Sequence, residues 1–215
     1  MKKICIFDLD GTLVNSLEDL SQSTNYALAK HGFDTYKTNE YKKFVGDGVP
    51  VLIKRVLGEK ATRDAEAAVL ADFNFYYNAH FADHTRPYDG NLELLRELDA
   101  RGIKCAVLSN KPDNFVKIIV AKFYPDFKFA AVQGKTERFP KKPDPAALLF
   151  MLSELSAKPE DALFIGDSNV DIFTGKNAGI ETCGVTWGFR SRAELEAAGA
   201  DKIADSPSQI LDFLC

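Results

Sequence analysis

Short apolar runs alternate with helix-length segments over most of this 215-residue chain. The runs are rich in Val, Ile, Phe and Ala, and they span residues 3–8, 103–108, 129–132, 162–165, 180–185 and, more weakly, 202–204. Between most of them, Leu, Ile and Phe recur at the spacing of one helix face. Apolar strands that alternate with amphipathic helices are typical of a parallel sheet covered on both faces. The pattern predicts an α/β protein with a Rossmann-like parallel sheet core.

Proline residues stand where several of these helices are expected to begin. Pro112, Pro145 and Pro207 each follow a polar residue at the boundary of an expected helix. The first turn of a helix tolerates proline because N–H groups there have no partner within the helix. These positions therefore predict helix starts.

The segment 15–83 interrupts the alternation. It contains no convincing strand, and its apolar residues repeat at helical spacing. A block of helices inserted after the first strand predicts a small all-helical cap over the carboxyl edge of the sheet. We therefore expect a core domain of residues 1–14 and 84–215 and a helical cap domain of residues 15–83. The returning segment 86–90 holds Pro and Gly and is expected to form the second hinge.

Composition and charge narrow the class of protein. Apolar residues make up 46% of the chain and charged residues 27%, as in ordinary globular proteins. Lysine and arginine total 27 and aspartate and glutamate total 31, so the formal net charge is −4. Binding to nucleic acid or to anionic membranes concentrates positive charge, so we expect neither partner.

The sequence shows no targeting or membrane-spanning pattern. Only a short apolar run follows Met1-Lys2-Lys3 before Asp8 interrupts it, unlike a secretory signal. No apolar stretch reaches the roughly 18 residues that a membrane span needs. The cysteines form no C-x-x-C pair, which favours reduced, buried thiols; they are Cys5, Cys105, Cys183 and Cys215. These features predict a cytoplasmic protein.

An acidic pair follows the first apolar strand directly. Asp8 ends the strand and Asp10 lies two residues on, in the sequence Asp-Leu-Asp-Gly-Thr. The carboxyl ends of strands form the ligand crevice of an open α/β sheet, where two carboxylates repel each other and lose solvation. Mg²⁺, which prefers oxygen ligands, would resolve this, and Gly11 would let the backbone approach an anion. A lone pair of this kind is more often a solvated turn, but its place after an N-terminal strand favours a metal site.

Two later motifs also follow apolar runs. Ser109 and Asn110 offer neutral hydrogen-bond groups that can hold phosphate oxygens, although an N-capping role before Pro112 is a common alternative. In Lys141-Lys142-Pro143, Lys142 is expected to point inward and to neutralise a phosphate. Two solvated surface lysines are the alternative.

A final acidic motif follows the run 162–165. Asp167 stands at the strand end, and Asp171 falls in the first turn of a helix that starts near Ser168. Asp171 is a candidate for stabilising the helix dipole, but together with Asp167 it would also complete a metal site. Because all these motifs occupy strand ends of one predicted sheet, we expect them to form one site.

Together these motifs resemble those of phosphatases of the haloacid-dehalogenase superfamily, over essentially the whole chain. Residues 8–12 match the first motif, Ser109 the second, Lys142 the third, and residues 166–168 with Asp171 the fourth. The inserted helices resemble the superfamily's type C1 helical cap. Three further segments resemble the phosphoglycolate-phosphatase branch: residues 45–49, 185–190 and 199–201.

The resemblance implies a Mg²⁺-dependent phosphatase that hydrolyses a small phosphorylated metabolite, such as 2-phosphoglycolate, through an aspartyl-phosphate. Asp8 would be the nucleophile and Asp10 the general acid and base. The side chains of Asp8 and Asp167 and the main-chain carbonyl of Asp10 would hold Mg²⁺, with Asp171 acting through a water or a hydrogen bond. Gly11, together with the side chains of the later motifs, would hold the phosphoryl group; those residues are Ser109, Asn110 and Lys142.

The cap would close over the site to exclude water and carry residues that select the substrate. Gly46, Asp47 and Gly48 are a candidate substrate loop, although Gly-Asp-Gly is also an ordinary turn. The chain departs from the branch at Asn15, where Asp is usual. Asn15 lies beyond the expected metal site, so we expect this change to affect the cap hinge rather than the chemistry.

Other functions remain open at this point. Pyrophosphatases, sugar-phosphate phosphatases and phosphomutases of the superfamily share much of the pattern. A metal-free dehalogenase is less consistent with Asp10 and Asp167. A receiver-like phospho-acceptor module uses similar residues, but a long helical insertion after its first strand fits it poorly. We expect a monomer or a homodimer.

Overall fold

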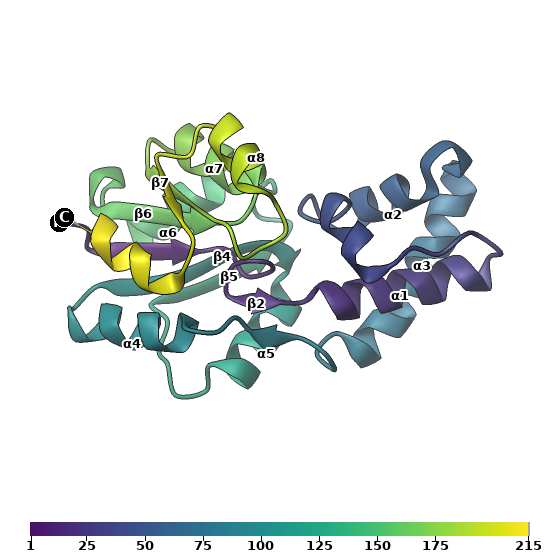
Figure 1. The fold of residues 1–215 in the computed structure, drawn as a ribbon, viewed down its shortest axis with the longest axis horizontal. Coiled ribbons are helices and arrows are strands. Elements are labelled where there is room, and N and C mark those ends of the chain that lie inside the picture. The colour runs from purple at the N-terminus through teal and green to yellow at the C-terminus, as the bar shows by residue number, and fades with distance from the viewer. Residues whose placement is uncertain (215) are drawn as a thin grey trace. The chain divides into compact units, whose positions relative to one another are not determined.

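The computed structural model describes residues 1–214 and divides into two compact units (Figure 1). The core unit contains Met1–Val14 and the chain from Pro87 onward, and the helical unit contains Asn15–Arg86. The chain passes between them twice, through β2 (Val14–Asn15) and β3 (Arg86–Pro87), which pair as a two-stranded sheet.

A six-stranded sheet forms the centre of the core unit, in the order β5-β4-β1-β6-β7-β8. Every strand pairing in it is parallel. The strands are β1 (Ile4–Phe7), β4 (Lys104–Pro112), β5 (Ala131–Lys135), β6 (Ala162–Gly166), β7 (Glu181–Val185) and β8 (Lys202–Ala204). The predicted α/β class and parallel sheet are therefore confirmed.

Two strands differ most from the sequence prediction. β5 spans Ala131–Lys135 rather than residues 129–132, and β4 continues past Leu108 to Pro112. The pairing of β4 with β5 shifts register between Leu108 and Pro112, where Pro112 pairs with Lys135. This irregularity lets the strand continue through polar residues that apolar patterning assigns to a following loop.

Helices lie on both sides of the sheet (Figure 1). They are α4 (Asn91–Ala100), α5 (Asp113–Phe123), α6 (Ala146–Glu154), α7 (Asn169–Asn177) and α8 (Arg192–Ala197), with 3₁₀ segments η3 (Pro159–Asp161) and η4 (Pro207–Phe213). On one face, Ile4 and Ile6 of β1 pack in a buried cluster with Leu148 and Leu152 of α6. Successive strand residues point to opposite faces, so a strand buried on both sides must be apolar throughout.

The proline positions are confirmed as helix starts in two cases and corrected in one. Pro112 directly precedes α5, and Pro145 directly precedes α6. Pro207 instead opens the 3₁₀ segment η4. Proline fixes φ near a value that α- and 3₁₀-helices share, so it predicts where a helix starts without choosing between the two.

The helical unit consists of α1 (Leu17–Lys30), η1 (Thr38–Lys43), α2 (Val49–Leu57), η2 (Gly58–Lys60) and α3 (Arg63–His80). α1 and α3 pack together, and Leu28 of α1 and Val69 and Phe73 of α3 are buried. Asp19 is also buried, and its carboxylate accepts hydrogen bonds from the backbone N–H groups of His84 and Thr85 at 2.8 Å. These bonds tie the start of α1 to the end of the unit.

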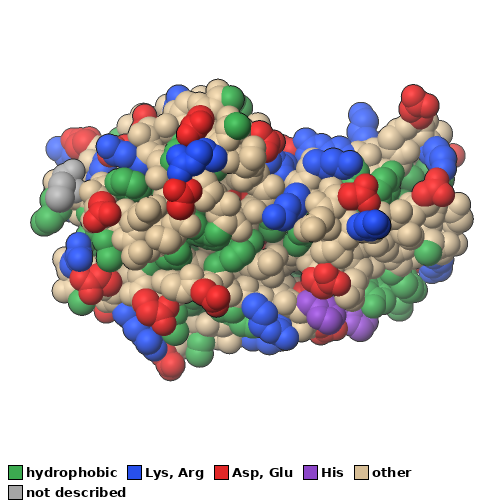
Figure 2. Space-filling view, viewed as in Figure 1, with side chains coloured by type: hydrophobic (Ala, Val, Ile, Leu, Met, Phe, Trp, Pro, Cys, Tyr) green, Lys and Arg blue, Asp and Glu red, His purple; other side chains and the backbone are tan. Residues whose placement is uncertain are grey.

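Charged side chains of both signs are interspersed over the face in Figure 2, consistent with the near-balanced composition. Within residues 1–214, no helix is long and apolar enough to cross a membrane. Cys5, Cys105 and Cys183 are buried free thiols, as expected, and Cys215 lies outside the described residues. Burial raises the pKa of Cys105 and of Cys183 to about 12, which keeps both as unreactive thiols.

Candidate active site

The central strand β1 places Asp8 at the carboxyl edge of the sheet. Phe7 pairs with Val107 of β4 on one side and with Ile165 of β6 on the other. The N–H of Asp8 donates to the carbonyl of Ile165 at 2.9 Å, so the ladder continues to the carboxylate-bearing residue. This register brings the ends of three parallel strands together around Asp8, which is buried.

The chain turns sharply after Asp8, and Gly11 makes the turn possible. Its φ is +90°, a conformation that side chains with a Cβ rarely adopt. A Cβ at Gly11 would also lie 2.2 Å from Oδ2 of Asp167. The missing side chain therefore lets the loop after β1 and the strand end of β6 approach each other closely.

Hydrogen bonds to the main-chain carbonyls of Thr12 and Leu13 hold the loop in place. The indole N–H of Trp187 donates to the carbonyl of Thr12 at 3.0 Å, and the amide of Asn91 donates to the carbonyls of both Thr12 and Leu13 at 2.9 and 3.1 Å. The hydroxyl of Tyr124 donates to the carbonyl of Leu13 at 2.8 Å. Donors from three separate parts of the core unit thus fix the chain just beyond Asp10.

Three buried carboxylates cluster at this edge. Asp8, Asp167 and Asp171 each offer an oxygen, and these oxygens all lie within 4.8 Å of one another. Burial, together with Asp171 and Asp10, raises the pKa of Asp8 to about 6 against the opposing effect of Lys142. Burial and the nearby Asp171 and Asp8 also hold the pKa of Asp167 well above its usual range. The cluster is therefore short of positive charge.

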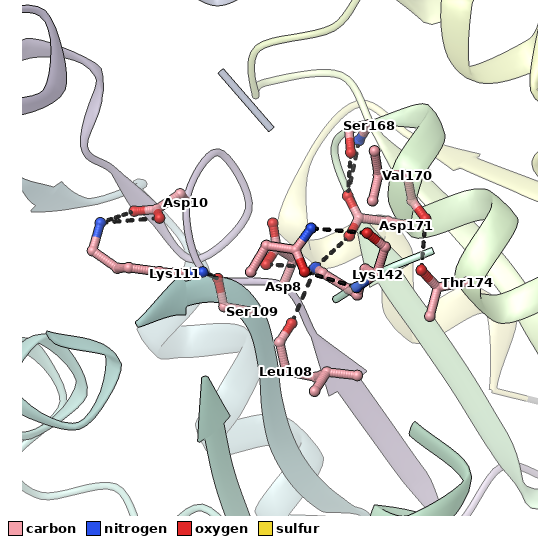
Figure 3. A network of polar contacts seen from close by, with 11 residues as sticks. Asp8, Asp10, Leu108, Ser109, Lys111, Lys142, Ser168, Val170, Asp171 and Thr174 are labelled. Atoms are coloured by element: carbon pink, nitrogen blue, oxygen red, sulfur yellow. Dashed lines mark hydrogen bonds and ion pairs between the residues drawn. The ribbon is translucent and has the colours of Figure 1, made fainter. Parts of the chain in front are cut away.

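Lys142 lies between two of these carboxylates (Figure 3). Its Nζ is 2.8 Å from Oδ1 of Asp8 and 2.6 Å from Oδ1 of Asp171, and it donates to the carbonyl of Leu108 at 3.1 Å. Burial alone would lower the pKa of Lys142, but Asp171 and Asp8 raise it above the usual value. Lys142 is therefore a buried ammonium ion, whereas Lys141 is exposed.

Asp171 caps the start of α7 and also faces the buried lysine. Its Oδ2 accepts hydrogen bonds from the backbone N–H and the hydroxyl of Ser168 at 3.1 and 2.7 Å, which forms a capping box at the start of α7. Its Oδ1 faces Lys142. A Cβ on Gly166 would lie 2.2 Å from the Cβ of Asp171, so a glycine is needed at the end of β6 for this approach.

Ser109 and Asn110 lie within β4, next to this cluster. The Asn110 side chain accepts from the N–H of Lys142 at 2.8 Å and donates to the carbonyl of Lys142 at 3.1 Å. It therefore ties β4 to the segment that carries Lys142. The hydroxyl of Ser109 is buried and accepts from the N–H of Lys111 at 3.3 Å.

The Asp10 side chain lies outside the carboxylate cluster and pairs with Lys111, a residue that apolar patterning and motifs did not single out. Nζ of Lys111 is 2.9 and 3.0 Å from the two carboxylate oxygens of Asp10 (Figure 3). The side chain of Lys111 is only 4% exposed. Because β4 continues beyond Leu108, Lys111 lies within the strand, two positions after Ser109. The apolar pattern ends this strand at Leu108 and therefore gives no signal for Lys111.

The candidate substrate loop belongs to the helical unit. Gly46 and Gly48 have φ of +112° and +86°, and Gly48 directly precedes α2. The carboxylate of Asp47 is 2.6 Å from the guanidinium of Arg55. Asn15, at the start of this unit, accepts a hydrogen bond from the N–H of Leu17 at 3.3 Å. These contacts tie the loop to α2 through Arg55 and tie Asn15 to the first residue of α1.

The carboxylate cluster fits a divalent cation. Its donors are oxygens, which Mg²⁺ prefers, and Lys142 offsets only part of the charge of Asp8, Asp167 and Asp171. Burial that raises the pKa of a carboxyl group destabilises its ionised form, and a bound cation would reverse that effect. Glycine at position 11 leaves the approach to Asp167 open.

Comparisons with known proteins agree with this geometry. The family model of haloacid dehalogenase-like hydrolases matches residues 5–185. A phosphoglycolate phosphatase from Haemophilus influenzae is 35% identical over 99% of this chain and 98% of its own length. Another, phosphoglycolate phosphatase 1 from Pseudomonas aeruginosa, is 31% identical over 100% of this chain and 78% of its own.

A solved structure is similarly close. A crystal structure from Haemophilus somnus, of a predicted phosphoglycolate phosphatase, has a TM-score of 0.91 and 32% identity and covers 100% of this chain and 98% of its own. The chain therefore belongs to the haloacid dehalogenase-like hydrolases. Within that family it is an enzyme of the phosphatase type, and it is similar to phosphoglycolate phosphatases.

Proposed function

We propose that this enzyme is a Mg²⁺-dependent phosphatase that hydrolyses a small phosphomonoester through an aspartyl-phosphate on Asp8, with 2-phosphoglycolate as the first candidate substrate. The observation that carries the proposal is the position of Asp8: a buried carboxylate at the end of the central strand, 2.8 Å from the ammonium of Lys142 and beside Asp167 and Asp171. The names of the relatives from Haemophilus influenzae and Pseudomonas aeruginosa support the substrate.

In the first step, an oxygen of Asp8 forms a bond to phosphorus while the bond between phosphorus and the ester oxygen breaks. Asp10 gives its proton to the departing alcohol. Lys142 is placed to offset negative charge on the transferred group, since its Nζ already contacts Asp8. The hydroxyl of Ser109 and the backbone at Gly11 would hold phosphate oxygens, and Asn110 would keep Lys142 in place through its backbone.

In the second step, Asp10 takes a proton from a water molecule, whose oxygen attacks phosphorus of the aspartyl-phosphate. The bond between phosphorus and the Asp8 oxygen breaks, which releases phosphate and restores the carboxylate. Asp10 lies two residues after Asp8 on a loop held by Trp187 and Asn91. These hydrogen bonds hold the backbone next to Asp10 in a fixed position, from which its side chain would make both proton transfers.

The side chains of Asp8 and Asp167 and the main-chain carbonyl of Asp10 would hold Mg²⁺. Asp171, which lies beside Lys142, would act through a water or a hydrogen bond. When bound, Mg²⁺ reduces repulsion between the anionic nucleophile and the phosphate and stabilises charge that develops on the phosphoryl oxygens. We further propose that the helical insertion, predicted as residues 15–83, serves as a cap that excludes water during the reaction.

The test is phosphate release from a panel of phosphoesters, with Mg²⁺ and with a chelator. The panel contains 2-phosphoglycolate, pyrophosphate, hexose phosphates and nucleoside monophosphates. We expect Mg²⁺-dependent turnover that Asp8→Asn reduces by roughly 1,000-fold or more. The exposed Glu93→Gln serves as a matched carboxylate control. Turnover that survives Asp8→Asn would contradict the nucleophile, and a faster rate on another ester would replace 2-phosphoglycolate as the substrate.

A further inference from the structure

Lys111 is a buried cation that the proposed reaction does not use. It stands at the end of β4, with its side chain only 4% exposed, and it contacts both carboxylate oxygens of Asp10. Burying an ammonium ion is costly unless an anion accompanies it. The pair with Asp10 meets that requirement, and it shows that the surroundings of Lys111 accept a carboxylate.

The geometry of the proposed reaction indicates which part of the substrate lies near Lys111. As the acid that protonates the departing alcohol, Asp10 must come within hydrogen-bond distance of the ester oxygen, about 2.6–3.2 Å. In a short acid such as glycolate, the carboxylate is attached to the carbon that bears this same oxygen. Lys111 contacts Asp10, whose short side chain must also reach that oxygen, so the ammonium lies within a few bonds' reach of the place where the carboxylate of the departing alcohol arrives.

The strand geometry supports the same placement. Ser109 and Lys111 are two positions apart at the end of β4, and the N–H of Lys111 donates to the hydroxyl of Ser109 at 3.3 Å. Ser109 is the candidate for holding the phosphoryl group. One strand end thus presents a hydroxyl for the phosphate and an ammonium ion for a second anionic group on a short substrate.

We propose that Lys111 binds a carboxylate on the departing alcohol, and that Asp10 occupies this place before substrate arrives. This inference rests on the proposed phosphatase function and assigns the substrate class to phosphomonoesters of short hydroxy acids. The carboxylate of the substrate exchanges with that of Asp10 at Lys111. Asp10 is then released from its ion pair, takes up a proton from solvent and turns to the ester oxygen. A neutral alcohol at the same place leaves Asp10 held by Lys111. The negative charge of the substrate therefore both strengthens its binding and frees Asp10 to act as the acid.

The experiment compares two esters that differ in one group. 2-Phosphoglycolate carries a carboxylate, and 2-hydroxyethyl phosphate carries a neutral hydroxymethyl group in its place. We expect the wild type to prefer 2-phosphoglycolate in kcat/KM. Lys111→Met, which keeps the apolar stem and removes the charge, should cut that preference by roughly 10- to 100-fold, as for the loss of a charged hydrogen bond. Lys111→Arg, which keeps the charge, should retain more of the preference than Lys111→Met.

Lys117→Met is the matched control, because Lys117 is an exposed lysine on α5 that pairs with Asp113; it should leave the ratio unchanged. A merely structural role of Lys111 would lower kcat/KM for both esters by the same factor, and that result would overturn the proposal. Equal use of both esters by the wild type would also overturn it. If the wild type hydrolyses neither these esters nor any other phosphomonoester, the proposed function itself has failed.

Discussion

The Nζ atom of Lys142 lies 2.8 Å from a carboxylate oxygen of Asp8, and both side chains are buried. The same ammonium lies 2.6 Å from Asp171. One lysine thus serves two carboxylates in a place where water does not screen their charges. The pair accounts for how a buried aspartate at the end of the central strand can be ionised, as the proposed nucleophile must be.

Replacing Lys142 should therefore reduce the stability of the fold. Lys142→Met leaves Asp8 and Asp171 without their shared cation, and we expect the free energy of unfolding near neutral pH to fall by about 3–5 kcal/mol. Urea unfolding would measure the loss. Lys141→Met is the matched control, because Lys141 is the exposed neighbour. An equal effect of the two substitutions would contradict the structural account of Lys142.

Stability without metal should depend on pH in a defined direction. The pKa of Asp8 is raised to about 6, above the value of about 4 for an aspartate in an unfolded chain. Between these values the folded protein binds more protons than the unfolded chain, so its stability falls as pH rises. The contribution is complete below about pH 4 and lost above about pH 6, and the raised pKa of Asp167 acts in the same direction. Thermal unfolding in chelator would measure this fall, and Asp8→Asn should reduce it.

Added Mg²⁺ should reverse this effect most strongly where the carboxylates are ionised. A metal at the proposed site would bind the deprotonated forms of Asp8 and Asp167, so metal binding and proton release would be linked. We expect Mg²⁺ to raise the Tm more at about pH 7.5 than at about pH 5.5. Calorimetry at both values of pH would show the difference. A Tm shift that is independent of pH would argue that the cation binds elsewhere on the protein.

Gly11→Ala should abolish activity through two separate effects. The residue has a φ of +90°, and a Cβ there would lie 2.2 Å from Asp167. Gly32→Ala is the matched control, since Gly32 has a φ of +73° but a Cβ there would meet nothing within 4 Å. We expect both variants to lose about 1 kcal/mol of stability from backbone strain, and Gly11→Ala to lose more because its Cβ overlaps Asp167. Only Gly11→Ala should also lose phosphate release, and activity close to the wild type would contradict the close approach to Asp167.

The hydrogen bonds that hold the loop after β1 can be tested with Tyr124→Phe. This change removes the hydroxyl that donates to the carbonyl of Leu13, while Asn91 still donates to the same carbonyl. We expect a loss of about 1 kcal/mol in unfolding free energy, since the carbonyl keeps a partner. Asn91→Ala should cost more, because the amide serves the carbonyls of both Thr12 and Leu13. Chemical denaturation would rank the two variants, and the reverse order would contradict this network.

Much of the fold and of the candidate site could be predicted from local patterns. Apolar runs identified the strands, and parallel strands place their carboxyl ends at one edge of a sheet. Polar residues that follow such runs therefore reach the same edge, and strand order decides which of them are neighbours. Asp8 and Asp167 were predicted to share this edge, and the structure brings them together with Asp171 because β1 and β6 are adjacent. Lys142 was predicted to point inward from its place beside Pro143, and it is buried.

The partners of individual side chains were decided by tertiary structure alone. β4 shifts register against β5 and continues to Pro112, which brings Lys111 to Asp10. The amide of Asn110 meets the backbone of Lys142, a residue far away along the chain. By itself, the sequence determined which chemical groups reach the edge of the sheet, because strand identity depends on local apolar pattern. Only the folded chain decided which group faces which, because that depends on register and turns between segments that are distant in sequence.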